Sequence, residues 1–207
     1  MARNRRRKRQ VLLEEKPSKF GNVILEIIFW ILEIVVAILL GFLLVRYGAE
    51  KMTVSGSSME TILTNGDSVI IEKLTKKVRD YKRFDVVAFQ QNKKDHNYYN
   101  IKRIIGLPEE TVQIIDGKVY INGEILEDKY AEEDMANAGV ASAEISLEKN
   151  EYFVLGDNRN NSEDSRFANV GNVVASDIIG RVFIRISPGF AFISLLEPEK
   201  LEEAEEK

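Results

Sequence analysis

Residues 23–45 form an apolar segment that constrains this chain more than any other feature. As a helix the segment would reach about 34 Å, and the hydrocarbon core of a bilayer is about 30 Å thick. It is too long for a removable signal peptide, and no small-residue cleavage site is evident in it. The segment therefore predicts a single transmembrane helix in contact with the lipid bilayer.

The charges around this segment predict its orientation. Residues 1–22 carry eight Lys or Arg against two Glu, whereas only Arg46 and Lys51 follow the segment closely. Basic residues mark the cytoplasmic end of a transmembrane helix. We therefore expect a single pass through the plasma membrane, with a cytoplasmic N-terminus and an extracytoplasmic domain. A basic arm can also indicate a nucleic-acid partner, but its place directly before an apolar segment favours the membrane, and we expect no nucleic acid.

Two glutamates interrupt the apolar segment. Glu26 and Glu33 are seven positions apart and would share one face of a helix. A carboxylate at the centre of a bilayer costs about 2.5 kcal/mol or more. Glu26 could lie at the interface, whereas Glu33 would be protonated, face a partner helix or simply be tolerated.

Short apolar runs rich in β-branched residues dominate the chain after the membrane segment. The runs 111–115 and 118–121 meet across Asp116-Gly117, which is a strong signal for a two-residue hairpin, and Asn122-Gly123 predicts the next turn. The other predicted strands are 68–73, 84–90, 101–106 and 178–186. This pattern predicts an all-β domain with antiparallel sheets in a partly open, barrel-like or sandwich-like arrangement.

The chain is thus expected to have four parts. These are a basic cytoplasmic arm at 1–22, the transmembrane helix at 23–45, an extracytoplasmic domain at 46–196 and an acidic tail at 197–207. Within the domain, 128–151 is acidic, rich in small residues and without a clear period, so we expect a surface excursion there. The tail has six Glu against two Lys and is expected to be frayed or disordered.

The chain has one histidine, His96, and no cysteine. A zinc site built on several histidines is therefore excluded, and we expect no metal and no cofactor. A Ser-His-Asp triad would have to use His96, which lies in the polar run 92–97 and is expected to face solvent.

A dense polar run at 156–166 directly follows the apolar run 152–155. Buried or half-buried polar groups need partners, so this run suggests a network that holds something in place. Two upstream residues could be what it holds. Ser58 follows the flexible run 55–57, and Lys102 is flanked by isoleucines. A serine and an apolar-flanked lysine can act as a nucleophile and its general base.

In this order the three segments resemble the boxes of bacterial type I signal peptidases, in their short Gram-positive-like form. Ser58-Met59 is similar to the serine box and Lys102-Arg103 to the lysine box. Residues 156–166 match every fixed position of the terminal Gly-Asp-Asn-Arg-x-x-Ser-x-Asp-Ser-Arg box. Shorter matches at 66–67, 85–89 and 106–108 extend the resemblance to about residue 186. The resemblance implies a membrane-anchored serine endopeptidase with bent antiparallel sheets, which removes signal peptides from exported preproteins.

The resemblance also implies roles for individual residues. Ser58 would be the nucleophile and Lys102 the general base. A base must be largely neutral, whereas a free lysine has a pKa of about 10.4. Burial among the neighbouring isoleucines and Met59 would lower that pKa.

A supporting network would surround this pair. Ser162 would hydrogen-bond and orient the lysine amine. Asp164 and Arg166 would form an ion pair, and Asp157 would join the same network. Arg103 would point to the opposite face of its strand and be structural.

The oxyanion hole is only partly assigned. The backbone N–H of Ser58 would be one donor. Some family members supply a second from a serine two positions earlier, but Gly56 stands there, so that donor stays unassigned. Thr61 and Ile62 replace the family's usual Pro-Thr, which removes no catalytic atom.

The implied substrates are exported preproteins with small residues before the cleavage site. An extended peptide could add as a strand, with Val54, Phe84 and Ile101 lining shallow apolar pockets. The protein-export machinery would be a partner by proximity. One alternative is a self-cleaving repressor-type Ser-Lys protease, against which the membrane segment and the terminal box argue. Another is a catalytically silent membrane-anchored assembly factor, which would be expected to have lost the serine or the lysine.

Overall fold

The computed structural model describes residues 19–74, 79–90, 99–131 and 133–195. His96, the predicted acidic tail and most of the predicted basic arm lie outside these residues. The chain divides into two compact units, 1–46 and 47–207.

One long helix, α2 (Lys19–Gly48), contains the predicted membrane segment. Large apolar side chains along it are exposed, and Phe29, Trp30 and Ile38 are each 67% exposed. A helix that is apolar on all sides is stable only where something apolar surrounds it. The run Val23–Gly48 is long and apolar enough to cross a membrane.

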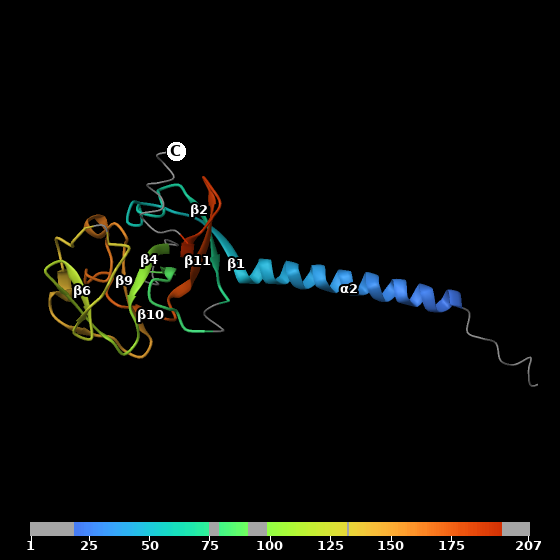
Figure 1. Ribbon diagram of the computed structural model, residues 1–207, viewed down its shortest axis with the longest axis horizontal. Helices are drawn as coiled ribbons and strands as arrows, with labels where there is room; N and C mark the ends of the chain where they lie inside the picture. The colour runs from blue at the N-terminus through green and yellow to red at the C-terminus, as the bar shows by residue number, and fades with distance from the viewer. Residues whose placement is uncertain (1–18, 75–78, 91–98, 132, 196–207) are drawn as a thin grey trace, which may run out of the picture. The chain divides into compact units, whose positions relative to one another are not determined.

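The second unit contains two antiparallel sheets (Figure 1). The larger sheet has the strand order β1-β2-β11-β3-β4-β9-β10, and β12 pairs with β11 outside this path. Its strands are β1 (Ala49–Thr53), β2 (Ser68–Glu72), β3 (Val86–Gln90), β4 (Tyr99–Gly106), β9 (Glu151–Leu155), β10 (Val173–Val174), β11 (Ile178–Ser187) and β12 (Ala191–Phe192).

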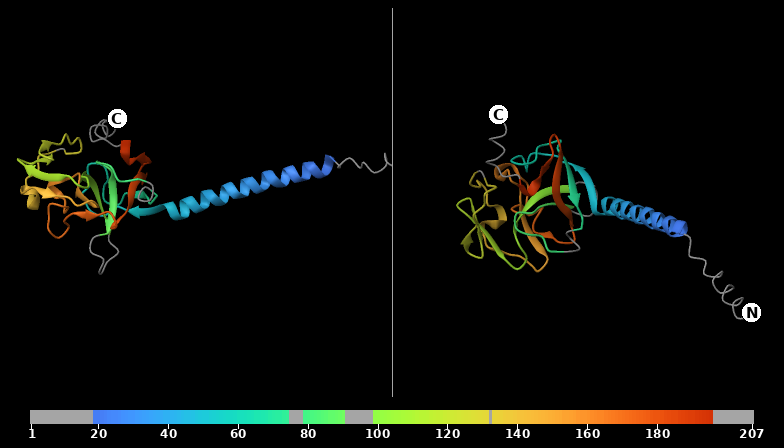
Figure 2. Two further views of the ribbon diagram at one scale, coloured as in Figure 1. Left: turned by 90° about the horizontal axis from the view of Figure 1, so that it is seen from below. Right: turned by 45° about the vertical axis from the view of Figure 1, so that its right-hand side comes forward.

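The last long strand lies in the middle of this sheet. β11 pairs with β2 through 181–187 and with β3 through 178–181. In Figure 2 the orange-red β11 lies beside the blue-green β2, and the cyan β1 pairs with the other edge of β2. The register of β11 shifts between Val182 and Ile184 and again between Arg185 and Ser187. Bulges of this kind bend a strand and increase its twist, which gives the expected bending of the sheet a local cause.

The smaller sheet has the order β7-β6-β5-β8 and lies at the end of the domain away from β1 (Figure 1). Its strands are β5 (Thr111–Ile115), β6 (Lys118–Ile121), β7 (Glu124–Ile125) and β8 (Ile145–Ser146). The predicted hairpin is confirmed, since β5 and β6 pair directly. Asp116 and Gly117 have φ values of 50° and 77°, as the favoured two-residue turn requires. Asn122 and Gly123 form the predicted turn to β7, also with positive φ.

Three buried clusters hold the domain together. The first packs the loop between β1 and β2 against β2, β3, β4 and β11. The second joins the small sheet to β4 and β9, and the third covers the other side of β3, β4 and β9. Single-turn helices complete the fold: η1 (Gly139–Ser142), η2 (Arg159–Asn161) and η3 (Ile193–Leu195). Because β4 is packed on both faces at its centre, the polar side chains of Lys102 and Arg103 there are buried.

The structure confirms the all-β, antiparallel prediction, and within the described residues neither sheet closes into a barrel. The strand predicted at 84–90 begins only at Val86, because Phe84 has a φ of 69°, in the left-handed region. The surface excursion expected at 128–151 was wrong in part. Tyr130, Met135 and Leu147 of this segment are buried. Its apolar residues are spaced too irregularly to show a period, yet Met135 and Leu147 belong to the second cluster.

Candidate active site

Ser58 lies in the loop between β1 and β2, and this loop is held at both ends. The N–H of Val54 donates to Asp67 O at 2.8 Å, and the N–H of Gly66 donates back to Val54 O at 3.0 Å. Within the loop, Leu63 N–H donates to Met59 O at 2.7 Å, which forms a helical turn. Met59 and Leu63 are buried in the first cluster. The residues after the serine are thus anchored in the core, and the half-buried Ser58 stands at the start of a fixed turn.

Lys102 lies in the centre of β4, opposite Val87 of β3. Its Nζ is 2.6 Å from Ser58 Oγ, across 44 positions of the chain. The residue is 3% exposed. Burial disfavours the charged amine and lowers the pKa of Lys102 to about 8, although the carboxylates of Asp164, Glu163 and Asp157 act in the opposite direction. A substantial share of this amine is therefore neutral at mildly alkaline pH and can accept the proton of the hydroxyl beside it.

The polar run 156–166 follows β9 and contacts the nucleophile loop. The N–H of Asn158 donates to Ser58 O at 3.1 Å, and Asn161 Nδ2 donates to Ser57 Oγ at 2.9 Å. Gly156 is packed so tightly that a Cβ there would stand 2.5 Å from Ser58 O and 2.2 Å from Ser162 Oγ. Such distances exclude any side chain larger than that of glycine. The run therefore fixes the backbone on both sides of Ser58.

The expected ion pair between Asp164 and Arg166 is present and buried. Arg166 Nε lies 2.8 Å from Asp164 Oδ1, and Nη2 lies 2.9 Å from Asp164 Oδ2. Asp164 Oδ2 also accepts the N–H of Gly156 at 3.1 Å, and Arg166 Nη2 donates to Arg159 O at 2.6 Å. The pair thus ties the end of the run 156–166 to its beginning. Two parallel Arg–carboxylate hydrogen bonds fix the geometry of this connection.

Ser162 lies beside this pair. Its hydroxyl is buried and has no hydrogen-bond partner among the residues that the structure describes. The expected bond between Ser162 and the amine of Lys102 is thus not formed here.

Asp157 is paired differently from the expectation. It binds Arg103, with Nε 2.7 Å from Asp157 Oδ1 and Nη2 2.6 Å from Oδ2. The third donor of Arg103, Nη1, reaches Phe84 O at 2.9 Å, and its guanidinium stacks 3.4 Å over the ring of Tyr130. Asp157 therefore does not join the Asp164–Arg166 pair directly. The sequence placed Arg103 on the face opposite Lys102 but did not identify its partner, because alternation along a strand gives direction and not distance.

The three residues expected to line a substrate pocket do not all lie together. Val54 and Ile101 share the first cluster, near Met59. Phe84 packs against the second cluster instead, with its ring 5.5 Å from that of Tyr130. Phe84 therefore lies apart from Val54 and Ile101, and only those two stand in the cluster that contains Met59, next to the nucleophile.

Ile62 and Gly56 differ from the residues that are usual near the family's serine box, and the structure shows the surroundings of both. Ile62 is 1% exposed in the first cluster, so an apolar residue suits this position. Gly56 has a φ of 92°, and its N–H is occupied by Asn65 Oδ1 at 3.1 Å. Among the described residues no group of three or more His, Cys, Asp or Glu could hold a metal ion.

Comparison with known proteins places this chain in a family. Residues 27–187 match the family described as "Signal peptidase, peptidase S26". A probable signal peptidase I-2 from Synechocystis is 37% identical over 158 residues, which cover 74% of this chain and 70% of that protein. Signal peptidase I P from Bacillus subtilis subsp. natto is 34% identical over 176 residues, covering 82% and 91% respectively. A crystal structure of a signal peptidase I from Enterococcus faecalis aligns with a TM-score of 0.42 at 31% identity, over 51% of this chain and 98% of that one. The family match over residues 27–187 and the two sequence relatives show that this chain belongs to the signal peptidase family, peptidase S26.

Proposed function

We propose that this protein is a membrane-anchored serine endopeptidase that removes signal peptides from exported preproteins, with Ser58 as nucleophile and Lys102 as general base. The observation that carries the assignment of residues is the 2.6 Å contact between Lys102 Nζ and Ser58 Oγ inside a buried site. Membership of the signal peptidase family supports the reaction. The retained serine and lysine speak against the alternative of a catalytically silent assembly factor.

The chemistry begins when a substrate carbonyl reaches Ser58. Neutral Lys102 takes the hydroxyl proton as Oγ bonds to the carbonyl carbon, and the backbone N–H of Ser58 is the candidate donor to the resulting oxyanion. Lys102 then gives its proton to the departing amine, which leaves an acyl-enzyme. Water activated by the same amine attacks that ester, and the new carboxyl end leaves as Ser58 regains its proton.

The contacts around the pair suggest how it is kept in register. Asn158 and Gly156 fix the backbone at Ser58. Asp164 and Arg166 hold the loop that contains both of these residues. Ser162, whose hydroxyl is unpaired, would complete the arrangement by binding the amine of Lys102 when a substrate is present. The binding energy of the substrate would then align Ser58 and Lys102, whose side chains already lie within hydrogen-bond distance of each other.

The substrate would bind as an extended strand with small residues before the scissile bond. Val54 and Ile101 are the candidates for the apolar pockets, since both lie in the cluster that includes Met59. The anchor would be α2, with residues 1–22 in the cytoplasm and the domain 46–196 outside the plasma membrane. The basic residues before the apolar run support this orientation, and it would place the site near the protein-export machinery.

The test is cleavage of a secretory preprotein by the detergent-solubilised protein, with wild type compared with Lys102→Ala. The product should begin just after a small residue, as read by mass spectrometry, and only the wild type should form it. Lys51→Ala, at an exposed lysine of β1, is the matched control and should cleave normally. Absence of cleavage by a folded wild type would favour the assembly-factor alternative.

A further inference from the structure

Four residues of the apolar run 23–45 are neither bulky aliphatic nor aromatic, and all four lie on one face of α2. They are Glu26, Glu33, Ala37 and Gly41. At about 100° per residue, these positions fall within about 80° of the helix surface. Every other residue of the run is Val, Ile, Leu, Phe or Trp. One face of α2, here called the Glu33 face, therefore differs in chemistry and in size from the rest of the helix.

Glu33 lies near the middle of the run, about 15 Å from its start, whereas Glu26 lies close to the start and within reach of the headgroups. Of the residues three or four positions from Glu33, only Trp30 has a polar side-chain group. Within the described part of the chain, no hydrogen bond or ion pair involves Glu33. The hydrocarbon of a bilayer offers no hydrogen-bond partner either. The carboxyl group of Glu33 therefore needs a partner from another molecule.

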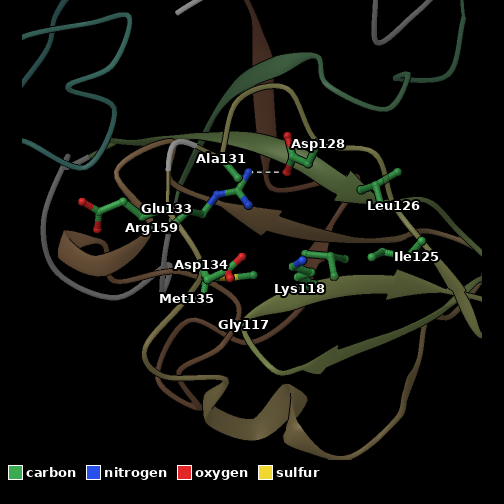
Figure 3. A pocket seen from close by; sticks show the side chains of 11 residues that line it. Gly117, Lys118, Ile125, Leu126, Asp128, Ala131, Glu133, Asp134, Met135 and Arg159 are labelled. Carbon is green, nitrogen blue, oxygen red and sulfur yellow. Dashed lines mark hydrogen bonds and ion pairs between the residues drawn. The ribbon is translucent and has the colours of Figure 1, made fainter.

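The domain shows how this protein treats carboxylates that are removed from water. Asp128 pairs with Arg159 beside the small sheet, as the dashed line in Figure 3 marks, and Asp157 pairs with Arg103. A carboxyl group in apolar surroundings is stable only when it is paired. A second molecule that supplied a partner for Glu33 would meet the same requirement inside the membrane.

Gly41 is not required by the packing of its own chain. A Cβ at this position would meet nothing within 4 Å. Glycine is disfavoured in the interior of a helix, because it loses more conformational freedom than other residues. Ala37, four positions earlier, is the other small residue of the run. Small residues at this spacing let the backbones of two membrane helices approach closely. A helix packed on the Glu33 face would thus give both positions a purpose.

A second copy of α2 fits this face better than an unrelated helix. All copies enter the membrane in the same orientation, so two of them pack in parallel, with each residue at the depth of its counterpart. A symmetric pair then brings the same face of both helices together. Glu33 would face Glu33, and a protonated carboxyl group both donates and accepts a hydrogen bond. An unrelated helix would have to present a matching polar group at that depth.

We propose that α2 joins two copies of this chain in the membrane through the Glu33 face. Ala37 and Gly41 would lie where the two helices approach most closely, and the two Glu33 carboxyl groups would bind each other. The inference requires that α2 spans the bilayer, and it is independent of the roles proposed for Ser58 and Lys102. Each dimer would carry two peptidase domains.

The chain has no cysteine, so a single introduced cysteine reports on one position. Membrane vesicles from cells that express full-length Ala37→Cys protein would be oxidised with copper phenanthroline, and disulfide-linked dimer would be measured on a non-reducing gel. We expect dimer from Ala37→Cys. Leu39→Cys is the matched control, because it lies at a similar depth on the opposite face, and it should give little dimer. Equal cross-linking at the two positions, or none at Ala37→Cys, would overturn the proposal.

Purified protein identifies the occupant of the face. Ala37→Cys in excess detergent micelles should still form the dimer, because a second copy is then the only protein present. Cross-linking to a different protein in the vesicles, with no dimer from the purified protein, would assign the face to that protein and overturn the pairing of two copies.

The role of the carboxyl group is tested in the Ala37→Cys background. Glu33→Leu should lower the association constant about fivefold, as read from the cross-linked fraction at graded ratios of detergent to protein. Glu33→Gln retains a group that donates and accepts, so it should pair nearly as well as the parent. Ile28→Leu, on the opposite face, is the matched control and should change nothing. Full pairing by Glu33→Leu would overturn the contact between the two Glu33 residues.

Discussion

Lys102 and Arg103 are neighbours in β4, yet their charged ends make two separate buried contacts. Lys102 Nζ lies 2.6 Å from the neutral hydroxyl of Ser58, whereas Arg103 lies 2.6 Å from the carboxylate of Asp157. Among the described residues no carboxylate is in hydrogen-bond contact with the lysine, and its pKa is lowered. The arginine has a bidentate carboxylate partner. β4 thereby carries two neighbouring basic residues with different environments. The amine of Lys102 can act as a base, whereas the guanidinium of Arg103 stays charged in a buried ion pair with Asp157.

The pH dependence of cleavage should follow the amine of Lys102. Its pKa is lowered to about 8, and only the neutral form accepts a proton, so activity is lost as pH falls through that value. We expect kcat/KM to rise about tenfold per pH unit below the pKa and to level off above it. Steady-state cleavage of a preprotein between about pH 6 and about pH 10 would measure this. A rate that does not change over this range would contradict a lysine base.

The same burial should cost stability. The pKa of Lys102 is lower in the folded protein than its ordinary 10.5, so the folded state binds fewer protons between about pH 8 and pH 10.5. Wild type therefore gains stability as pH rises through that window, and below it the whole cost is present. Lys102→Met should be more stable than wild type at pH 7 by up to about 3 kcal/mol, and the difference should shrink towards pH 10.5. Denaturant unfolding at several pH values would show it, with Lys51→Met at an exposed lysine as a control that lacks the pH-dependent difference.

Removing the partner of Arg103 should destabilise the domain. Asp157→Asn leaves a guanidinium that is 1% exposed without its carboxylate, and loss of one member of a buried pair costs about 3–5 kcal/mol. The exposed pair between Lys73 and Glu50 offers the comparison, and Glu50→Gln should cost less than about 1 kcal/mol. Equal losses of unfolding free energy in the two variants would mean that burial does not determine the cost of breaking the Arg103–Asp157 pair.

Gly156 should not accept a side chain. The Cβ of Gly156→Ala would stand 2.5 Å from Ser58 O, so the nucleophile loop must move. Misplacement of a reacting group by about 1 Å can cost on the order of 100-fold in rate, and we expect a loss of that order in kcat. Gly189→Ala is the matched control, since a Cβ there meets nothing within 4 Å. Near-normal turnover by Gly156→Ala would show that the loop tolerates the displacement.

Ser162→Ala separates a catalytic contact from a structural one. The hydroxyl has no hydrogen-bond partner in the part of the chain that the structure covers, so its loss should change the unfolding free energy by less than about 0.5 kcal/mol. If Ser162 orients Lys102 during the reaction, kcat should still fall at least about tenfold, and the midpoint of the pH profile should move. Unchanged turnover with an unchanged pH midpoint would remove Ser162 from the mechanism.

Local patterns in the sequence were enough to predict individual elements. The hairpin at Asp116-Gly117 was placed correctly because its turn chemistry lies within two residues. The insertion of β11 between β2 and β3 was not predicted, because strand order depends on contacts between residues far apart in the chain. The buried residues Tyr130 and Met135 were missed for the same reason, since irregular segments show no period.

The residues of the candidate site likewise include some that the sequence predicted and others that it did not. Ser58 and Lys102 were singled out by residue type and resemblance, and the structure brings them to 2.6 Å. No partner was predicted for Asp157, because an acidic residue in a polar run has several arginines within reach and only packing selects one. Phe84 was expected beside Val54, but its left-handed backbone turns the chain before β3 begins.

The central position of β11 has a consequence for how the enzyme is made. Until residues 178–187 have been synthesised, the hairpin-like pair β1–β2, whose connection contains Ser58, has no sheet partner linking it to the strands that carry Lys102. The sheet that joins the Ser58 loop to the strand of Lys102 is therefore completed by pairings between residues far apart in the chain, and pairings of this kind form slowly. We therefore expect proteolytic activity to appear only after β11 has joined β2 to β3.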